Sequence, residues 1–134
     1  MKIVYAYVVG DLLHFGHLRH LINCKALGDK LVVGVLTEEA VMEKKPKPVI
    51  PFAERLALIQ GLGCVDIAIP QDTYSPHDNV KRVGADVLVE STSHSQKLLA
   101  HGKSLMESLG GRMVVLPYYQ GISSTQIKKE IKNG

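Results

Sequence analysis

Apolar, β-branched runs alternate along the chain with segments that have helical spacing. Residues 3–9 are nearly all apolar, which is typical of a strand buried in a parallel sheet. Gly28 and the pair Gly110-Gly111 supply stops for the helices before them. The expected strands cover residues 3–9, 31–36, 65–69, 86–89 and 113–116, and the expected helices 17–27, 38–42, 51–61, 79–83, 96–109 and 123–131. Five strands separated by helices predict an α/β fold in which a doubly wound parallel sheet carries helices on both faces.

Bulk composition places the chain among small globular proteins. With 134 residues and a net charge of +3, we expect one domain covering residues 1–134, with no nucleic-acid partner. No apolar run reaches the roughly 18 residues that a membrane span needs, and the first residues have the pattern of a strand. Two cysteines, Cys24 and Cys64, do not suggest a disulfide scaffold. These features predict a cytoplasmic protein whose partners are small molecules.

Two histidines lie where the first strand gives way to the first helix. His14 and His17 flank Gly16, which lets the backbone approach a ligand closely. A helix N-terminus at the carboxyl edge of a parallel sheet favours phosphate, and imidazole donors stabilise charge that develops during phosphoryl-type transfer. Two alternatives remain: ordinary surface histidines, and a zinc site that adds His20 and Asp11.

A second anion-binding segment follows the fifth expected strand. Ser123, Ser124 and Thr125 come after Gly121-Ile122 at the start of the last expected helix. Ser123 is a natural helix cap, which is the simpler explanation when the segment is considered alone. Because both segments follow parallel strands, we expect them to meet at one edge of the sheet and to hold a triphosphate there.

These two segments resemble the motifs of the HxGH nucleotidyltransferases. His14-Phe15-Gly16-His17 with Gly121-Ile122-Ser123-Ser124-Thr125 looks like the cytidylyltransferase branch, which includes glycerol-3-phosphate cytidylyltransferases and domains of phosphonate-pathway enzymes. The resemblance covers essentially the whole chain. It implies a single Rossmann-like domain that transfers CMP from CTP to a phosphate- or phosphonate-bearing acceptor, with Mg²⁺ or another divalent cation, in a homodimer.

The resemblance also implies roles for individual residues. His14, His17 and Lys44 would be catalytic, with Lys44 closing over the phosphates from a basic loop. A solvated surface loop is the alternative interpretation of this segment, and for Lys45 and Lys47 the two interpretations carry equal weight. Asp11 would lie beside the phosphates and help to hold Mg²⁺. Nucleotide binding would involve Val8, Val9, Gly10, Asp11, Gly16, Arg55, Gly121, Ile122, Ser123, Ser124 and Thr125. A helix-surface ion pair would also explain Arg55.

Departures from the family pattern concern the acceptor and the phosphate contacts. Glu90, Ser91 and His94 stand where the family has a Gly-Asp-Asp-Trp-like turn, and we expect them to bind the acceptor. Tyr118 and Gly63 replace arginines of the family pattern. The departures leave two alternatives open: an adenylyltransferase that uses ATP, and a regulatory module that binds nucleotide without catalysis.

Overall fold

The computed structural model describes residues 1–117 and contains a five-stranded sheet. The strands are β1 (Ile3–Val8), β2 (Lys30–Leu36), β3 (Ile67–Gln71), β4 (Val87–Ser91) and β5 (Arg112–Leu116). Every pair is parallel and the order is β3-β2-β1-β4-β5. The predicted Rossmann-like α/β fold with a five-stranded parallel sheet is confirmed.

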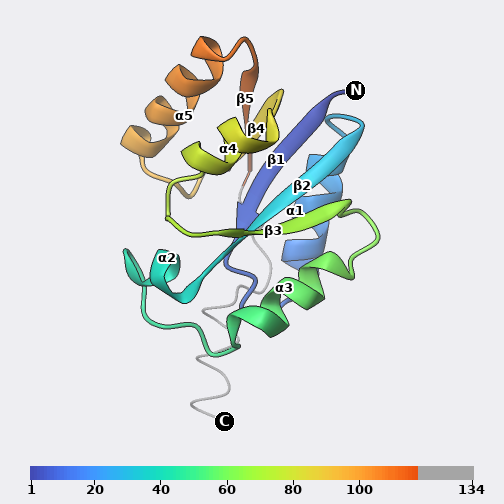
Figure 1. Ribbon diagram of the computed structural model, residues 1–134, viewed down its shortest axis with the longest axis vertical. Helices are drawn as coiled ribbons and strands as arrows, with labels where there is room; N and C mark the ends of the chain where they lie inside the picture. The colour runs from blue at the N-terminus through green and yellow to red at the C-terminus, as the bar shows by residue number, and fades with distance from the viewer. Residues whose placement is uncertain (118–134) are drawn as a thin grey trace.

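Helices cover both faces of this sheet (Figure 1). They are α1 (Phe15–Lys25), α2 (Glu38–Met42), α3 (Phe52–Gln60), α4 (His77–Val83) and α5 (Gln96–Ser108). Helices α1 and α3 lie on one face and α4 and α5 on the other, while the short α2 sits beyond the end of β2. The helix expected at 123–131 lies outside the described residues.

Alternating side chains of the central strands form two separate cores. Val4 and Ala6 of β1 face the cluster that contains Leu21 of α1 and Ile59 of α3. Tyr5, between them in sequence, faces the opposite cluster. Successive strand side chains point to opposite faces, so a strand with helices on both sides must be apolar throughout. This explains the continuous apolar run of β1.

The third strand differs from the predicted segment 65–69 by starting and ending later. Asp66 precedes the strand, and its carboxylate accepts hydrogen bonds from the Leu31 N–H and the Lys25 ammonium, each at 2.7 Å. The strand then runs through Pro70, which is tolerated because β3 is the edge of the sheet. The strand therefore lies two residues later than the apolar pattern predicted, at the edge of the sheet, where burial is incomplete.

The fourth strand is longer than predicted and carries polar residues at its end. Residues 86–89 were expected, but β4 continues to Ser91 because Glu90 and Ser91 pair with Val115 and Leu116 of β5. Backbone pairing does not depend on side-chain polarity. Glu90 and Ser91 thus lie on a strand, whereas the sequence suggested a turn.

Strand order reverses between β1 and β4. The chain proceeds outward from β1 to β2 and β3 on one side, and through β4 and β5 on the other. Adjacent crossovers then leave on opposite faces, which opens a crevice at the carboxyl ends of β1 and β4. This crevice is where ligands bind in folds of this type.

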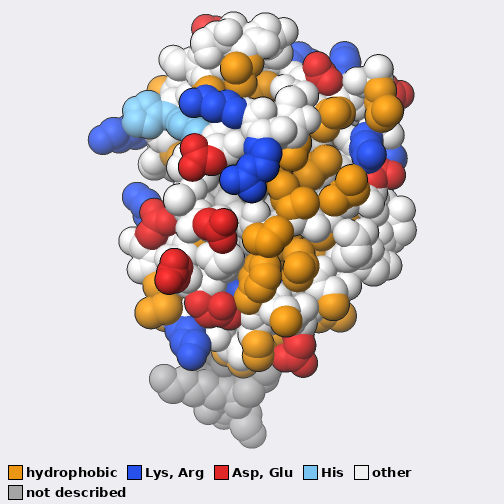
Figure 2. Space-filling view, in the orientation of Figure 1, with side chains coloured by type: hydrophobic (Ala, Val, Ile, Leu, Met, Phe, Trp, Pro, Cys, Tyr) orange, Lys and Arg blue, Asp and Glu red, His pale blue; other side chains and the backbone are white. Residues whose placement is uncertain are grey.

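The outer surface mixes charges of both signs. On the face shown in Figure 2, Lys and Arg side chains are interspersed with Asp and Glu, and hydrophobic side chains gather along the middle of the view. Ile67 of β3 and Leu58 of α3 are among the exposed large hydrophobic residues. Within residues 1–117, no helix combines the length and apolar character needed to cross a lipid bilayer.

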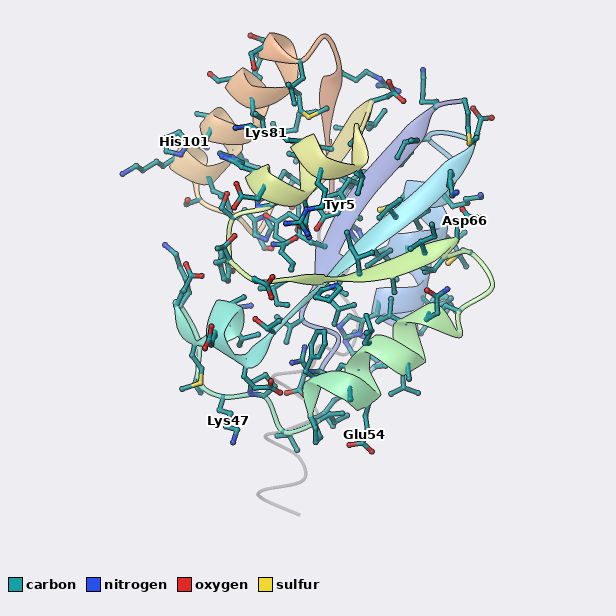
Figure 3. The ribbon with its side chains drawn as sticks, viewed as in Figure 1. Tyr5, Lys47, Glu54, Asp66, Lys81 and His101 are labelled. Atoms are coloured by element: carbon teal, nitrogen blue, oxygen red, sulfur yellow. The ribbon has the colours of Figure 1, made fainter. Side chains whose placement is uncertain are left out.

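Gly34 of β2 allows a buried polar network to form between the sheet and α4. The Tyr5 hydroxyl donates to Gln71 Oε1 at 2.5 Å and accepts from Asn79 Nδ2 at 2.9 Å. Figure 3 shows Tyr5 in the space between the sheet and α4. A Cβ at position 34 would clash with the Tyr5 hydroxyl and lie 2.7 Å from Gln71 Oε1.

We therefore expect Gly34→Ala to lower the free energy of unfolding by about 1–3 kcal/mol, because the added methyl overpacks a buried network. Gly63→Ala is the matched control, since a Cβ there meets nothing within 4 Å. Its effect should stay within about 0.5 kcal/mol. Urea denaturation of both variants checks this, and equal stability would contradict the argument.

Candidate active site

A cavity of about 700 Å³ opens at the carboxyl ends of β1 and β4. This volume is in the usual range for small-molecule sites. Its wall is formed by the end of β1 with the following turn, the first half of α1, α2 with the loop after it, the end of β4 with the following turn, and Pro117 after β5. The lining residues are Tyr7, Val8, Val9, Asp11, His14, Gly16, His17, His20, Val41, Lys45, Pro46, Lys47, Pro48, Val49, Val89, Ser91, Ser93, His94 and Pro117.

The two motif histidines start helix α1. His14 is the N-cap, and its Nδ1 accepts from the Gly16 N–H at 2.9 Å. His17 Nδ1 accepts from the His14 N–H at 3.2 Å. This is a capping box in which imidazoles replace the usual hydroxyl and carboxylate. Helix α1 begins at Phe15, two residues before the predicted start, because His14 and not a later residue caps it.

This capping fixes which nitrogen of each ring carries the proton. A neutral imidazole has one donor and one acceptor nitrogen, and Nδ1 is the acceptor in both rings. Nε2 is then the protonated nitrogen of His14 and of His17. The ring centroids lie 4.2 Å apart and both side chains line the cavity. Two neutral N–H donors are therefore held side by side at a helix N-terminus.

Burial keeps these imidazoles neutral. It lowers the pKa of His17 to about 4, helped by the nearby His14 and His20 and opposed by Asp11. Burial also lowers the pKa of His14. At neutral pH each ring therefore keeps Nδ1 as an acceptor for the helix cap and offers its single N–H, at Nε2, to phosphate oxygens.

Asp11 ties the turn after β1 to the basic loop. The turn passes through Gly10 and Leu12, which both have positive φ, at 74° and 49°. Asp11 is 3% exposed, and its carboxylate accepts from the N–H groups of Val49 and Ile50 at 3.0 and 2.9 Å. Both oxygens thus accept hydrogen bonds from the backbone, and a role for Asp11 in holding Mg²⁺ stays a prediction. No group of three or more His, Cys, Asp or Glu side chains within residues 1–117 is arranged to hold a metal ion.

Arg55 is a buried structural residue and not a surface one. Its side chain is fully buried, which contradicts the alternative of a helix-surface ion pair. Arg55 is not part of the cavity wall, and its predicted contact with nucleotide stays a prediction. The guanidinium donates to the carbonyl oxygens of Val9 and Leu36 at 2.6 Å and of Ile50 at 2.9 Å, and it lies 3.4 Å from Glu38. It therefore joins the ends of β1 and β2 to the loop that precedes α3.

The loop lysines differ in their position relative to the cavity, and the catalytic role of Lys44 stays a prediction. Lys45 and Lys47 line the cavity, whereas Lys44 does not. The Lys44 ammonium instead lies over the Tyr74 ring, 5.9 Å from its centroid, at the limit of a cation–π contact. Figure 3 shows Lys47 on the loop after α2. The run of three lysines signalled a basic loop, but it could not tell which side chain faces the cavity.

The predicted acceptor-binding residues separate into two groups. Ser91 and His94 line the cavity, as does Ser93, which lies within the expected stretch 90–94. Glu90 is 1% exposed and lies behind the wall, where its Oε1 accepts from the Tyr7 hydroxyl at 2.6 Å and lies 3.0 Å from His94 Nδ1. The polar run at residues 90–94 in the sequence therefore indicated part of this cavity wall.

The other residues considered in the sequence analysis have different outcomes. His20 lines the cavity, although its sole predicted role was zinc binding. Cys24 is buried and Cys64 packs against the same core, as expected, and both are free thiols. Tyr118 and the whole segment Gly121-Ile122-Ser123-Ser124-Thr125 lie outside the described residues. Its convergence with His14 and His17 stays a prediction.

We expect Arg55→Lys to lower the free energy of unfolding by about 2–4 kcal/mol. A lysine keeps the charge but cannot bond three carbonyls at once, so buried acceptors lose their partners. Arg112→Lys, on an exposed residue of β5, is the control and should change stability by less than about 0.5 kcal/mol. Guanidinium denaturation of the two variants distinguishes the buried role of Arg55 from a surface one.

Stability should fall as the pH drops from 6.5 toward 4. The pKa of His17 lies near 4 in the folded state and near 6.5 in the unfolded chain, so the unfolded chain binds more protons in this window. His17 should account for a loss on the order of 2 kcal/mol. In His17→Gln, the amide can still accept the His14 N–H, so this component of the loss should disappear. Unfolding curves at pH 7.5 and 4.5 measure it; identical losses would refute the assignment.

Comparisons with known proteins show which family the chain matches. A family model described as cytidylyltransferase-like matches residues 10–130. The bifunctional protein HldE of Vibrio vulnificus is 36% identical over 135 residues, which cover 99% of this chain and 28% of that protein. The chain thus spans about 28% of the length of this relative.

Solved structures share the fold of this chain. The lipopolysaccharide core biosynthesis protein of Thermoplasma volcanium is 30% identical, with a TM-score of 0.76 over 89% of this chain and 97% of that one. TmcAL of Thermotoga maritima, solved with α-thio ATP, is 13% identical with a TM-score of 0.72 over 99% of this chain and 50% of that one, and shows the fold alone. By its family match and its near-complete alignment with these relatives, the chain belongs to the cytidylyltransferase-like family of nucleotidyltransferases.

Proposed function

We propose that this protein transfers a nucleoside monophosphate from a nucleoside triphosphate to a small acceptor that carries a phosphate or phosphonate, and releases pyrophosphate. CTP is the first candidate donor, in keeping with the family description and the motif resemblance. One observation carries the proposal: helix capping fixes His14 and His17 so that Nε2 of each ring carries the donor proton in the cavity wall.

The chemistry follows from this placement. An oxygen of the acceptor's phosphorus group attacks the α-phosphorus, the bond from that phosphorus to the bridging β-phosphate oxygen breaks, and pyrophosphate leaves with the bond electrons. Negative charge grows on the α-phosphate oxygens and on the leaving group. Fixed imidazole donors and the N-terminus of α1 stabilise that charge more than the ground state. Lys45 and Lys47 add positive charge on the facing loop.

No covalent enzyme intermediate is required. The attacking phosphate or phosphonate is already an anion, so the reaction needs positioning and electrostatic stabilisation and no activated serine or cysteine. Burial raises the pKa of Cys24 to about 12, which makes its thiol a poor nucleophile. We expect the divalent cation to arrive with the triphosphate, because Mg²⁺ commonly binds through substrate phosphates.

The acceptor class and the base are finer parts of the proposal. The Thermoplasma volcanium relative is described as a lipopolysaccharide core biosynthesis protein, which supports a sugar phosphate as acceptor. ATP is the second candidate donor, because a cavity of about 700 Å³ accommodates a purine as readily as a pyrimidine. We also propose a homodimer, as the family resemblance implies.

Replacement of His14 tests the proposal. His14→Asn keeps a side-chain acceptor for the helix cap but removes the Nε2–H donor. We expect kcat for pyrophosphate release to fall by about 10²–10³-fold, the usual cost of losing one donor to a developing oxyanion. The assay pairs CTP or ATP with Mg²⁺ and a panel of sugar phosphates, alcohol phosphates and phosphonates.

His101→Gln is the matched control. His101 is an exposed histidine of α5 outside the cavity wall, so its replacement should leave the rate unchanged. Figure 3 shows its position on the outer side of α5. Absence of pyrophosphate with every donor and acceptor, or full activity in His14→Asn, would exclude this function.

A further inference from the structure

Glu90 is a buried carboxylate directly behind the cavity wall. Its side chain is fully buried, and one oxygen, Oε1, receives both of its contacts: the Tyr7 hydroxyl at 2.6 Å and His94 Nδ1 at 3.0 Å. The other oxygen, Oε2, has no hydrogen-bond partner among the described residues. Helix α5 presents Gly102 toward it, and a Cβ at that position would lie 3.6 Å from Oε2.

The surroundings of this carboxylate offer one source of positive charge. Burial raises the pKa of Tyr7 and of Tyr74, with Glu90 contributing to both, so these groups stay neutral phenols. The pKa of His20 on α1 is lowered by burial and by the nearby His94, so His20 is neutral too. Within residues 1–117, the one ion pair that Glu90 forms is with His94.

A buried carboxylate is costly unless a cation compensates it. Protonated His94 meets this need: its Nδ1–H donates to Glu90 Oε1, and its ring stacks on Tyr7 with centroids 5.6 Å apart. The carboxylate of this pair then lies behind the cavity wall, and the imidazolium lies in the wall itself.

The outer nitrogen of His94 has no partner in the described part of the chain. Nδ1 is occupied, no hydrogen bond joins Nε2 to residues 1–117, and the side chain lines the cavity. Ser91 and Ser93 line the same wall, and their hydroxyls lie 3.0 Å apart. A cationic N–H beside two hydroxyls is the donor set that a phosphorus oxyanion requires.

We propose that Glu90 and Tyr7 hold His94 as an imidazolium whose Nε2–H, together with Ser91 and Ser93, binds the phosphorus oxyanion of the acceptor. This inference rests on the proposed transfer reaction and deepens it. Glu90 and Tyr7 are positioning residues, because they act through His94. Bond making and breaking remain as described above, and His94 transfers no proton.

The arrangement predicts a preference among acceptors. His14 and His17 lie at the start of α1, which follows β1, while His94 belongs to the turn after β4, so the two oxyanion sites follow the two strands that flank the crevice. An acceptor with a phosphate or phosphonate dianion gains the charged contact, and a neutral alcohol does not.

Steady-state kinetics on the full chain test this assignment. We expect His94→Gln to raise the acceptor KM at least tenfold, with nucleotide affinity within about twofold of wild type, because one charge-assisted contact is lost. His94→Lys should recover part of the loss by restoring a cation. Glu90→Gln should raise the acceptor KM because His94 loses the partner that orients it, while His101→Gln should match wild type.

Binding provides a readout that does not depend on turnover. ¹⁵N spectra of the histidine rings are recorded while methyl phosphate or methylphosphonate is added to protein saturated with nucleotide. We expect the His94 Nε2 signal to move in wild type and the response to disappear in His94→Gln, which also covers the case that Glu90→Gln does not fold. The two probes distinguish a phosphate ester from a phosphonate as the preferred group.

The outcomes separate this inference from the proposed function. If transfer occurs and His94→Gln leaves the acceptor KM unchanged, or if the titration moves signals of His14 and His17 but not of His94, the inference is overturned and the transfer reaction stands. If no acceptor yields pyrophosphate while the probes still shift His94, the transfer reaction fails and the oxyanion site remains.

Discussion

The cavity depends on the buried guanidinium of Arg55. Parallel strands end with carbonyl groups that have no partner beyond the sheet, and here the carbonyls after β1 and β2 and that of Ile50 converge on one cation. Asp11 completes the connection by accepting the N–H groups of Val49 and Ile50. The Arg55 guanidinium and the Asp11 carboxylate thus hold the loop after α2 against the strand ends, and this loop forms part of the cavity wall.

Helix initiation and candidate chemistry share the same atoms at His14 and His17. The first N–H groups of a helix need acceptors, and two imidazole Nδ1 atoms provide them. That need sets the tautomer, and burial holds the rings neutral. On the other side of the crevice, Glu90 sets the orientation of His94 in a comparable way, from behind the wall. These three imidazoles are oriented through Nδ1, and in the proposed reaction each uses Nε2 toward the ligand.

Fold class and the first motif could be predicted because they follow from local patterns. Continuous apolar runs gave the buried strands β1, β2 and β4, and His14-Phe15-Gly16-His17 marked the turn that lines the cavity. Prediction failed where burial was partial or where contacts were distant in sequence. Edge strand β3 lies two residues later than expected, the loop lysines that line the cavity are Lys45 and Lys47, and the alternative of a surface ion pair for Arg55 is wrong because Arg55 is fully buried.

The sequence by itself determined the alternation of strand and helix, the parallel sheet and the identity of the motif histidines, because side-chain period and turn chemistry act over a few residues. Tertiary structure alone decided that Arg55 reaches Val9 and Leu36, residues 46 and 19 positions away, and that Glu90 lies beneath Tyr7, 83 positions away. Such pairings arise from strand order and register. No local pattern encodes them, because each depends on how elements far apart in the chain pack against one another.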